Sequence, residues 1–256
     1  MQQQNSYTFG DNDRAAERLY WLSRTFDAET LAYVRTAVRR RPHCCIDLGA
    51  GPGYLTRTLH HGLEAERTVG LEASPRFVER GQGELPQGVE LWLHDVTSAL
   101  PLRGDLMVSR FLLTHLRDPL AALRVWRESE PLLLILEELV RMSADLPLLS
   151  RYYELVALVQ RAAGQDMHIG ARLGELALHA GFVIESHGVQ RLELPIRAMA
   201  KLHALNLPTL RAQPVVAAEF SEGELDAMQR ALDELVADGA TGVVRVDMAR
   251  CRAVLA

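Results

Sequence analysis

The sequence predicts an α/β protein built on a doubly wound, parallel β-sheet. Three observations support this prediction: a buried strand runs into a glycine-rich turn, strand-like and helix-like segments alternate five times, and acidic residues stand at the ends of successive strands. Sheets of this kind bind ligands outside the carboxyl ends of their strands, at the point where the strand order reverses. We therefore expect a ligand site at the ends of the first strands.

The strongest single signal is the segment 44–55. Its first residues are apolar except for Asp47, and glycines then occupy positions 49, 51 and 53. Glycine permits a positive φ and leaves main-chain N–H groups open to a ligand. A dinucleotide fingerprint is disfavoured because Tyr54 stands where that motif needs Gly or Ala. A P-loop is disfavoured because no Lys-Ser or Lys-Thr pair follows a glycine.

The other elements of the core follow in order. Residues 10–41 predict two helices, with Asp11 or Asp13 as the cap of the first and Asp27 as the cap of the second. Strands are expected at 44–48, 68–72, 89–93, 105–109 and 131–138, and helices at 54–62, from 75 onward and at 118–126. This alternation favours crossover connections between parallel neighbours.

Two acidic residues stand at the ends of the second and third expected strands. Glu72 lies about 20 residues beyond the glycine turn, where a carboxylate can accept both ribose hydroxyls of a bound nucleoside. The alternative interpretation of Glu72 is a surface acid that caps the helix beginning near Ser74 and Pro75. Asp95 follows the third strand. The joint placement of the glycines and both acids at three successive strand ends is a stronger signal than any one match.

A known family shows the same set of features. The run Asp47-Leu48-Gly49-Ala50-Gly51-Pro52-Gly53 and the strand-end acids resemble the D-x-G-x-G-x-G loop and acids of class I S-adenosylmethionine-dependent methyltransferases. The resemblance covers about residues 44–138. It implies a Rossmann-like, seven-stranded, mostly parallel sheet, with a sixth strand at 182–194 and an antiparallel seventh at 242–248. It also implies S-adenosyl-L-methionine as the cofactor.

The resemblance further assigns roles to individual residues. It places Asp47, Gly49, Ala50, Gly51 and Gly53 at the methionine part of the donor, Glu72 and Ala73 at the ribose, and Asp95 and Val96 at the adenine. Tyr7, Arg110 and His115 complete the expected cofactor-binding set. For Tyr7, a hydrophobic staple against the first helix is an equally open interpretation.

Methyl transfer from a sulfonium is an in-line displacement, so the protein must chiefly align the reactants and exclude water. A base is needed only if the acceptor has a proton to lose, and His115 is the candidate catalytic residue. Tyr153 and His168 are candidate substrate residues, the alternative for His168 being a solvated loop histidine. No metal site is expected, because Glu137 and Glu138 alone do not make a set of converging carboxylates.

Beyond residue 138 the alternating pattern ends. Helices are expected at 146–163, 171–179, 196–205 and 221–236, with Pro208 and Pro214 as helix breakers. We expect one domain over 1–256, with N-terminal helices at 1–41, a cofactor-binding core at 42–140, and helical substrate or lid elements at 141–181 and 195–240. The helix at 146–163 is apolar on most sides, so it is buried, lines a cavity or forms a homodimer face.

Composition restricts the classes of partner. The 256 residues carry a formal charge of −5, which argues against a nucleic-acid substrate. The start of the chain lacks the features of a signal peptide, and the longest apolar run, 132–136, is too short for a membrane helix. The three cysteines form no C-x-x-C or Cys/His cluster, which favours a reducing cytoplasm.

The sequence thus predicts a cytoplasmic enzyme that transfers a methyl group from S-adenosylmethionine to a small, apolar or aromatic metabolite of natural-product type. Two alternatives stay open: a fold relative that uses the donor's positive charge for a cyclisation, and a non-catalytic partner subunit. The acceptor, and whether oxygen, nitrogen or carbon is methylated, are not determined by these patterns.

Overall fold

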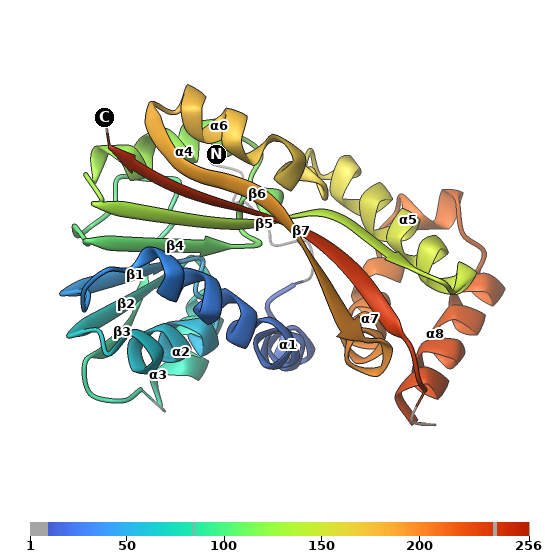
Figure 1. Ribbon diagram of the computed structural model, residues 1–256. Helices are drawn as coiled ribbons and strands as arrows, with labels where there is room; N and C mark the ends of the chain where they lie inside the picture. Colours follow the sequence, from blue (N-terminus) through green and yellow to red (C-terminus); the bar gives the residue numbers. More distant parts are fainter. Residues whose placement is uncertain (1–9, 84, 238–239, 256) are drawn as a thin grey trace.

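The structure is a computed structural model that describes residues 10–83, 85–237 and 240–255. Seven strands form one sheet in the order β3-β2-β1-β4-β5-β7-β6 (Figure 1). The strands are β1 (Cys44–Leu48), β2 (Arg67–Glu72), β3 (Val89–Leu93), β4 (Leu106–Arg110), β5 (Leu133–Ala144), β6 (Phe182–Pro195) and β7 (Val243–Leu255). The first five pair in parallel, and β7 runs antiparallel between β5 and β6. The expected seven-stranded, mostly parallel, doubly wound sheet is confirmed.

Eight helices surround the sheet in the described part of the chain. They are α1 (Asp13–Ala37), α2 (Tyr54–Leu63), α3 (Pro75–Gln82), α4 (Pro119–Glu128), α5 (Pro147–Ala162), α6 (Leu173–His179), α7 (Ile196–Arg211) and α8 (Glu222–Ala237). Short 3-10 helices are η1 (Leu113–His115), η2 (Ile169–Arg172) and η3 (Val216–Ala218). None of the described helices is long and apolar enough to cross a membrane.

Helices cover both faces of the parallel part of the sheet. Cys45 and Val108 point to the face on which α1 and α2 pack, whereas Ile46 and Met107 point to the face covered by α4 and α6. Successive residues of a strand face opposite sides, so strands buried on both faces read as continuous apolar runs. This explains why the core strands lack an alternating pattern in the sequence.

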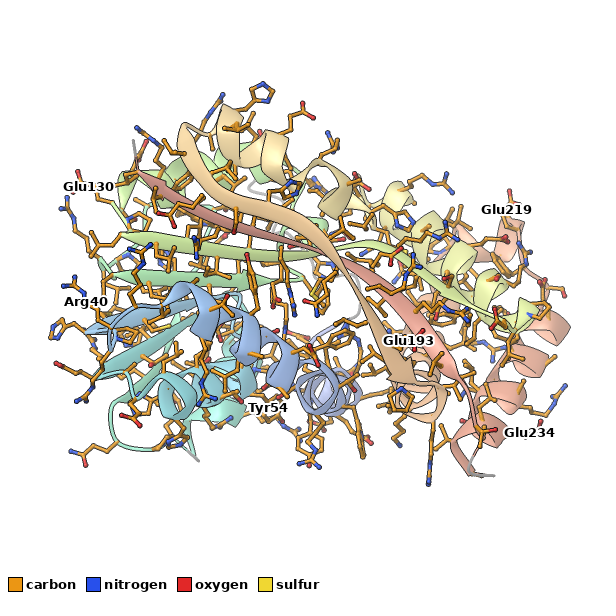
Figure 2. The ribbon with its side chains drawn as sticks, viewed as in Figure 1. Arg40, Tyr54, Glu130, Glu193, Glu219 and Glu234 are labelled. Atoms are coloured by element: carbon orange, nitrogen blue, oxygen red, sulfur yellow. The ribbon has the colours of Figure 1, made fainter. Side chains whose placement is uncertain are left out.

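A second hydrophobic core lies beyond the parallel sheet. The strands β5, β6 and β7 continue past it, and α5, α7 and α8 pack against their far ends (Figure 1). The outer surface of this region carries charged side chains such as Glu193, Glu219 and Glu234 (Figure 2). The helix at 146–163, expected to be apolar on most sides, is the buried α5 of this second core.

The N-terminal region differs from its prediction. Residues 13–37 form one helix of 25 residues, capped by Asn12, whose side chain accepts a hydrogen bond from the Ala15 N–H at 3.0 Å. The break expected at Asp27 is absent because this carboxylate serves a tertiary contact: it pairs with Arg110 at 2.8 Å and accepts a hydrogen bond from Thr58 at 2.9 Å. A single helix can therefore span from the sheet to the second core.

The tail also differs from its prediction in three places. β5 continues to Ala144, so the first residues of the expected 141–181 helical element are strand. The segment 171–179 is divided between η2 and α6. Pro208 does not end α7, which continues to Arg211 because Leu207 and Leu210 are both fully buried in the second core. Tertiary packing here outweighs the lost backbone hydrogen bond.

Candidate functional site

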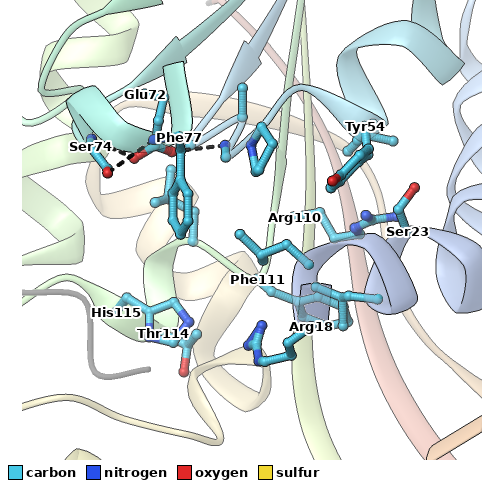
Figure 3. A pocket seen from close by; sticks show the side chains of 18 of the residues that line it. Arg18, Ser23, Tyr54, Glu72, Ser74, Phe77, Arg110, Phe111, Thr114 and His115 are labelled. Atoms are coloured by element: carbon cyan, nitrogen blue, oxygen red, sulfur yellow. Dashed lines mark hydrogen bonds between the residues drawn. The ribbon is translucent and has the colours of Figure 1, made fainter. Parts of the chain in front are cut away.

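A cavity of about 650 Å³ opens at the carboxyl ends of β1, β2 and β4. One part of its wall, the strand-end side, comes from the turns after β1, β2, β3 and β4, and the first half of α1 also lines the cavity. The opposite part, the helical side, comes from α5, α7 and the far parts of β5 and β7. Figure 3 shows the labelled side chains that surround the space. The site thus lies where the sequence analysis expects a ligand, and it reaches into the second core.

The glycine turn after β1 is locked against β2. The N–H groups of Gly49 and Ala50 both donate to the carbonyl of Leu71, at 2.9 and 3.0 Å. Gly49 has φ 72°, and an added Cβ there would lie 2.8 Å from Leu112. Gly53 has φ 77° and precedes α2, where a Cβ would meet Leu91 at 2.9 Å. These positions need glycine for both backbone and space.

The turn residues contribute unequally to the cavity. Gly49, Ala50 and Gly51 line it, whereas Gly53 is not among the lining residues. Gly53 instead begins α2 in a left-handed conformation. Its expected contact with a ligand is therefore replaced by a role in turning the chain.

Glu72 is held in place by main-chain donors. Its two carboxylate oxygens accept the N–H groups of Gly51 and Ser74, each at 2.8 Å (Figure 3). Burial raises the pKa of Glu72, and these hydrogen bonds oppose that rise. The cap of α3 is Ser74, whose hydroxyl accepts the Phe77 N–H at 3.3 Å. Glu72 is thus not a surface helix cap but a fixed carboxylate on the cavity wall, beside Ala73.

Asp47 is the most deeply placed acid of the strand-end side, at 2% exposure. The hydroxyl of Thr56 donates to its carboxylate at 2.7 Å. Burial raises the pKa of Asp47 to about 7, against the lowering effects of the Thr56 hydrogen bond and the charge of Arg110. The guanidinium of Arg110 lies on the cavity wall but is engaged by Asp27 and Thr30.

The turn after β3 contributes a polar and an apolar residue. Asp95 is exposed, and its carboxylate accepts the N–H of Thr97 at 2.9 Å, which fixes the turn. Val96 is buried, and its carbonyl accepts the indole N–H of Trp126 at 2.8 Å. Both line the cavity. The structure therefore brings Asp47, Glu72 and Asp95 together at neighbouring strand ends.

His115 also lies on the cavity wall, at the end of η1 (Figure 3). Burial, assisted by the charge of Arg18, lowers the pKa of His115 to about 3, so its ring is neutral at physiological pH. Glu138 holds the same segment, because its carboxylate accepts the Leu113 N–H at 2.6 Å. Burial raises the pKa of Glu138 to about 8. A neutral imidazole of this kind is a weak base.

The helical side is apolar with a few polar groups. Its apolar surface comes from Leu139, Met142, Val156, Met167, Met199, Leu202 and Val246. Tyr152 and His203 stack with ring centroids 4.3 Å apart, and Gln160 and Asn206 also line the wall. This composition is typical of a site for a small, largely apolar ligand.

Two expected substrate residues lie elsewhere. Tyr153 is not on the cavity wall: its hydroxyl lies 3.3 Å from Nε2 of His203, on the protein side of that ring. Neighbouring residues of a helix point about 100° apart, and Tyr152 is the tyrosine that faces the cavity. His168 is exposed, and its Nδ1 lies 2.8 Å from the Val140 carbonyl, which corresponds to its alternative interpretation. Tyr7 lies outside the described residues.

Arg18 is the main lining residue that the sequence analysis missed. It is 7% exposed on α1 and faces the cavity near His115 (Figure 3). Nothing in its local sequence sets it apart from the other charged residues of that helix. The other missed residues, Gln160, His203 and Asn206, occupy helix positions that only tertiary packing selects.

The residues of the strand-end side suit the donor expected from the sequence. Main-chain N–H groups and fixed carboxylates are placed for a nucleoside with a cationic amino-acid part. The described residues contain no group of three or more His, Cys, Asp or Glu side chains arranged for a metal ion.

Comparison with known proteins agrees with the resemblance found in the sequence. Residues 46–128 match a family model described as a methyltransferase domain. A search of curated proteins found no match. The YcgJ protein of Bacillus subtilis has a similar structure, with a TM-score of 0.59, 15% identity, and coverage of 90% of this chain and 99% of that one.

Two further solved structures are similar. One is a mycolic acid cyclopropane synthase in complex with S-adenosylhomocysteine, with a TM-score of 0.55, 16% identity, and coverage of 88% of this chain and 83% of that one. The other is a Haloferax volcanii complex of a methyltransferase with its activator, with a TM-score of 0.55, 16% identity, and coverage of 93% of each chain.

Proposed function

We propose that this chain is a class I S-adenosylmethionine-dependent methyltransferase that methylates a small, largely apolar metabolite. The match of residues 46–128 to a methyltransferase domain and the fold support this proposal. The observation that carries the proposal is the single cavity with two chemically different sides. Carboxylates and main-chain donors line the strand-end side, whereas aromatic and aliphatic side chains line the helical side. Such a cavity can hold a polar donor and an apolar acceptor against each other.

We propose that the strand-end side binds the donor. Each carboxylate oxygen of Glu72 already accepts one main-chain hydrogen bond, and a carboxylate has about four acceptor sites. The main-chain N–H of Ala73 also acts on this carboxylate, and its remaining acceptor capacity is left for the ribose hydroxyls. The ionised form of Asp47 suits the cationic ammonium of the methionine part, and Asp95 with Val96 lies where the adenine would bind.

The bound donor supplies an activated methyl group on a positively charged sulfur. The residues of the chain orient the two reactants and exclude water, which are the main requirements of an in-line displacement. We place His115 beside the reacting groups as a neutral contact that does not remove a proton, because a pKa of about 3 leaves it little basicity.

The acceptor is assigned to the helical side, with α5 and α7 as the covering elements. Its wall suits an apolar or aromatic metabolite, and natural-product intermediates belong to this class. The described cysteines are all buried and free, which fits a reducing compartment such as the cytoplasm. The apolar surface of α5 is covered by the same chain, so it no longer argues for a homodimer.

A second candidate reaction is a cyclisation. It is favoured by the similarity to a cyclopropane synthase structure, which shares the fold. Methyl transfer is the preferred proposal because both the methyltransferase-domain match and the two-sided cavity support it. The two candidates differ in whether the donor's methyl group ends in the product.

The test is transfer from methyl-deuterated S-adenosylmethionine into a small-molecule extract, followed by mass spectrometry, with a parallel titration of S-adenosylhomocysteine. We expect a labelled product and saturable binding. In Glu72→Ala, binding should weaken about 10- to 100-fold, the cost of losing charged hydrogen bonds. Glu79→Ala, an exposed acid on the adjacent α3, is the matched control and should bind normally.

Each contrary result has a definite meaning. Near-normal binding by a folded Glu72→Ala variant would contradict the ribose assignment. Binding without label, but with a cyclised product, would favour the second candidate. Absence of S-adenosylhomocysteine binding would contradict the donor site itself.

A further inference from the structure

Three aromatic side chains meet where the helical side of the cavity borders the second core. Tyr152 and Tyr153 are neighbours on α5, and His203 belongs to α7. The ring centroid of His203 lies 4.3 Å from that of Tyr152 and 5.4 Å from that of Tyr153. Tyr152 and His203 line the cavity, whereas Tyr153 does not. Tyr153 is therefore placed to act on a bound molecule through the ring of His203.

The contact between Tyr153 and His203 has a definite direction. The Tyr153 hydroxyl lies 3.3 Å from Nε2 of His203, and among the described residues it has no other hydrogen-bond partner. Burial raises the pKa of Tyr153, so the phenol keeps its proton at physiological pH. A buried hydroxyl that donates to nothing is costly. We therefore assign the phenol O–H as the donor and Nε2 as the acceptor.

This direction fixes the position of the imidazole proton. Burial, assisted by the charge of Arg18, lowers the pKa of His203 to about 3, so the ring is neutral. A neutral imidazole has one N–H and one acceptor nitrogen, and a hydrogen bond at one nitrogen decides which of the two holds the proton. Because Nε2 accepts from Tyr153, the proton is on Nδ1. His203 is thus a hydrogen-bond donor through Nδ1.

The Nδ1 atom is left for a ligand. In the described part of the chain it forms no hydrogen bond, and it is not one of the fully buried polar atoms. His203 is 4% exposed and lines the cavity, so a molecule in the cavity can reach this nitrogen. A donor in such surroundings is costly unless a ligand or water satisfies it. The wall therefore needs an acceptor atom from the bound molecule.

The charge of the surrounding wall restricts that molecule further. The lining residues contributed by α5, α7, β5 and β7 include no acid. A cationic amine placed there would have no counter-charge from these elements, and burying an unpaired charge is unfavourable. A neutral oxygen on an apolar molecule meets both conditions.

We propose that the methyl acceptor is an apolar molecule with a carbonyl oxygen, and that this oxygen accepts a hydrogen bond from Nδ1–H of His203. Tyr153 is the positioning residue that keeps the proton on Nδ1. The stacked ring of Tyr152 supports His203 from the cavity side. This inference rests on the proposed function, because it assigns the substrate class of the same cavity.

The first test compares two probes of nearly equal shape, 2-acetylnaphthalene and 2-isopropenylnaphthalene, in which a CH₂ group replaces the carbonyl oxygen. Each is titrated by calorimetry against the full chain saturated with S-adenosylhomocysteine. The ketone should bind about 3- to 10-fold more tightly, as expected of one neutral hydrogen bond. In His203→Phe, which keeps an aromatic ring against Tyr152, the preference should disappear.

The second test measures the position of the proton. Nitrogen NMR of the full chain, labelled at the histidine nitrogens, distinguishes a protonated ring nitrogen from an acceptor nitrogen, and the signals missing from His203→Phe identify His203. The wild type should show the Nδ1–H form. In Tyr153→Phe the Nε2–H form should appear, and the preference for the ketone should fall. Tyr20→Phe, at a position outside the cavity wall, is the matched control and should change neither result.

The outcomes separate this inference from the proposed function. If the wild type binds S-adenosylhomocysteine but binds both probes equally, or binds neither, the inference is wrong and the donor site stands. The inference is also wrong if the wild type shows the Nε2–H form, or if His203→Phe keeps the preference for the ketone. If His203→Phe does not fold, the wild-type spectrum and Tyr153→Phe still decide. If S-adenosylhomocysteine fails to bind the wild type, the proposed function fails, and the spectrum with the probes alone still tests His203.

Discussion

At the scale of single residues, the properties of Asp47 follow from its position at the end of a fully buried strand. The carboxylate is surrounded by protein and is reached by the hydroxyl of Thr56, and Arg110, Asp27 and Glu72 act on it through their charges. Burial dominates and raises the pKa to about 7. This residue therefore changes its charge within the physiological pH range.

Donor binding should depend on pH through Asp47. The carboxylate form suits a cationic ligand, and its fraction increases as the pH rises through about 7. At pH values below about 7, the affinity for S-adenosylhomocysteine should increase about 10-fold for each unit by which the pH rises. At higher pH values the affinity should become constant. Calorimetric titration between pH 5.5 and 8.5 measures this dependence.

The variant Asp47→Asn serves as the control for titration of the ligand itself, and its binding should vary much less with pH. Thr56→Val should move the midpoint to higher pH, because the Thr56 hydrogen bond lowers the pKa of Asp47. An equal pH dependence in the wild type and in Asp47→Asn would exclude Asp47 as the titrating group.

Whether a residue of the cavity can be predicted from the sequence depends on what places it there. Gly49 is required by the positive φ of its turn, and Glu72 is recognised by its place at the end of a strand. Both properties leave a pattern in the sequence. Arg18 and Tyr152 are selected by the packing of α1 and α5 against the second core. The sequence analysis named Tyr153 as a substrate residue, whereas Tyr152 lines the cavity. Two adjacent tyrosines in a helix that is apolar on most sides give no pattern that separates them.

At the scale of elements, α7 shows tertiary packing overriding local preference. Pro208 lies inside this helix and cannot donate to the carbonyl one turn earlier. The chain nevertheless continues as a helix because Leu207 and Leu210 contribute to the second core. The sequence rule that proline ends a helix therefore predicted an end six residues too early, at 205 instead of 211.

Pro208→Ala should stabilise the protein. Alanine restores a backbone donor and removes the steric conflict of the ring, which together are worth about 1–3 kcal/mol in a helix interior. Urea denaturation followed by circular dichroism measures the change in the free energy of unfolding. An unchanged or lower stability would show instead that the second core requires the helix geometry that proline imposes.

The strands were predicted more closely than the helices of the tail. The first and third strands, 44–48 and 89–93, have the predicted bounds, and the other core strands agree within a few residues at their starts. β5 and β7 extend well beyond their predictions, because β5 continues into the second core and β7 continues from the second core along the parallel sheet. The apolar residues of these extensions are compatible with either a helix or a strand. Only the antiparallel pairing of β5 with β7 determines that they form strands.

At the scale of the whole molecule, the cavity connects three parts of the chain: the strand ends, α1 and the helical side. A ligand that contacts all three should stabilise the folded state as a unit. At 100 times its dissociation constant, S-adenosylhomocysteine should contribute about 2.7 kcal/mol. For a chain of this size, this corresponds to a rise in Tm of about 5–10 °C.

Differential scanning calorimetry with increasing S-adenosylhomocysteine measures this rise, and a single transition should move. Adenosine, which lacks the amino-acid part, should give a smaller rise at equal concentration. Two transitions, of which only one responds, would show that the two cores unfold independently.

The continuous strands β5, β6 and β7 have a consequence for how such proteins diversify. The proposed donor contacts lie mostly in residues 47–96, and most of the proposed acceptor contacts lie in residues 139–206. The two sets of contacts can therefore change separately during evolution, while the strand register holds them at a fixed distance. A chimera that exchanges the segment from the middle of β5 to the start of β7 should inherit a new acceptor preference and keep its donor. The chimera must preserve the pairing of Glu137 in β5 with Arg250 in β7, because this pairing belongs to the register that aligns the two strands.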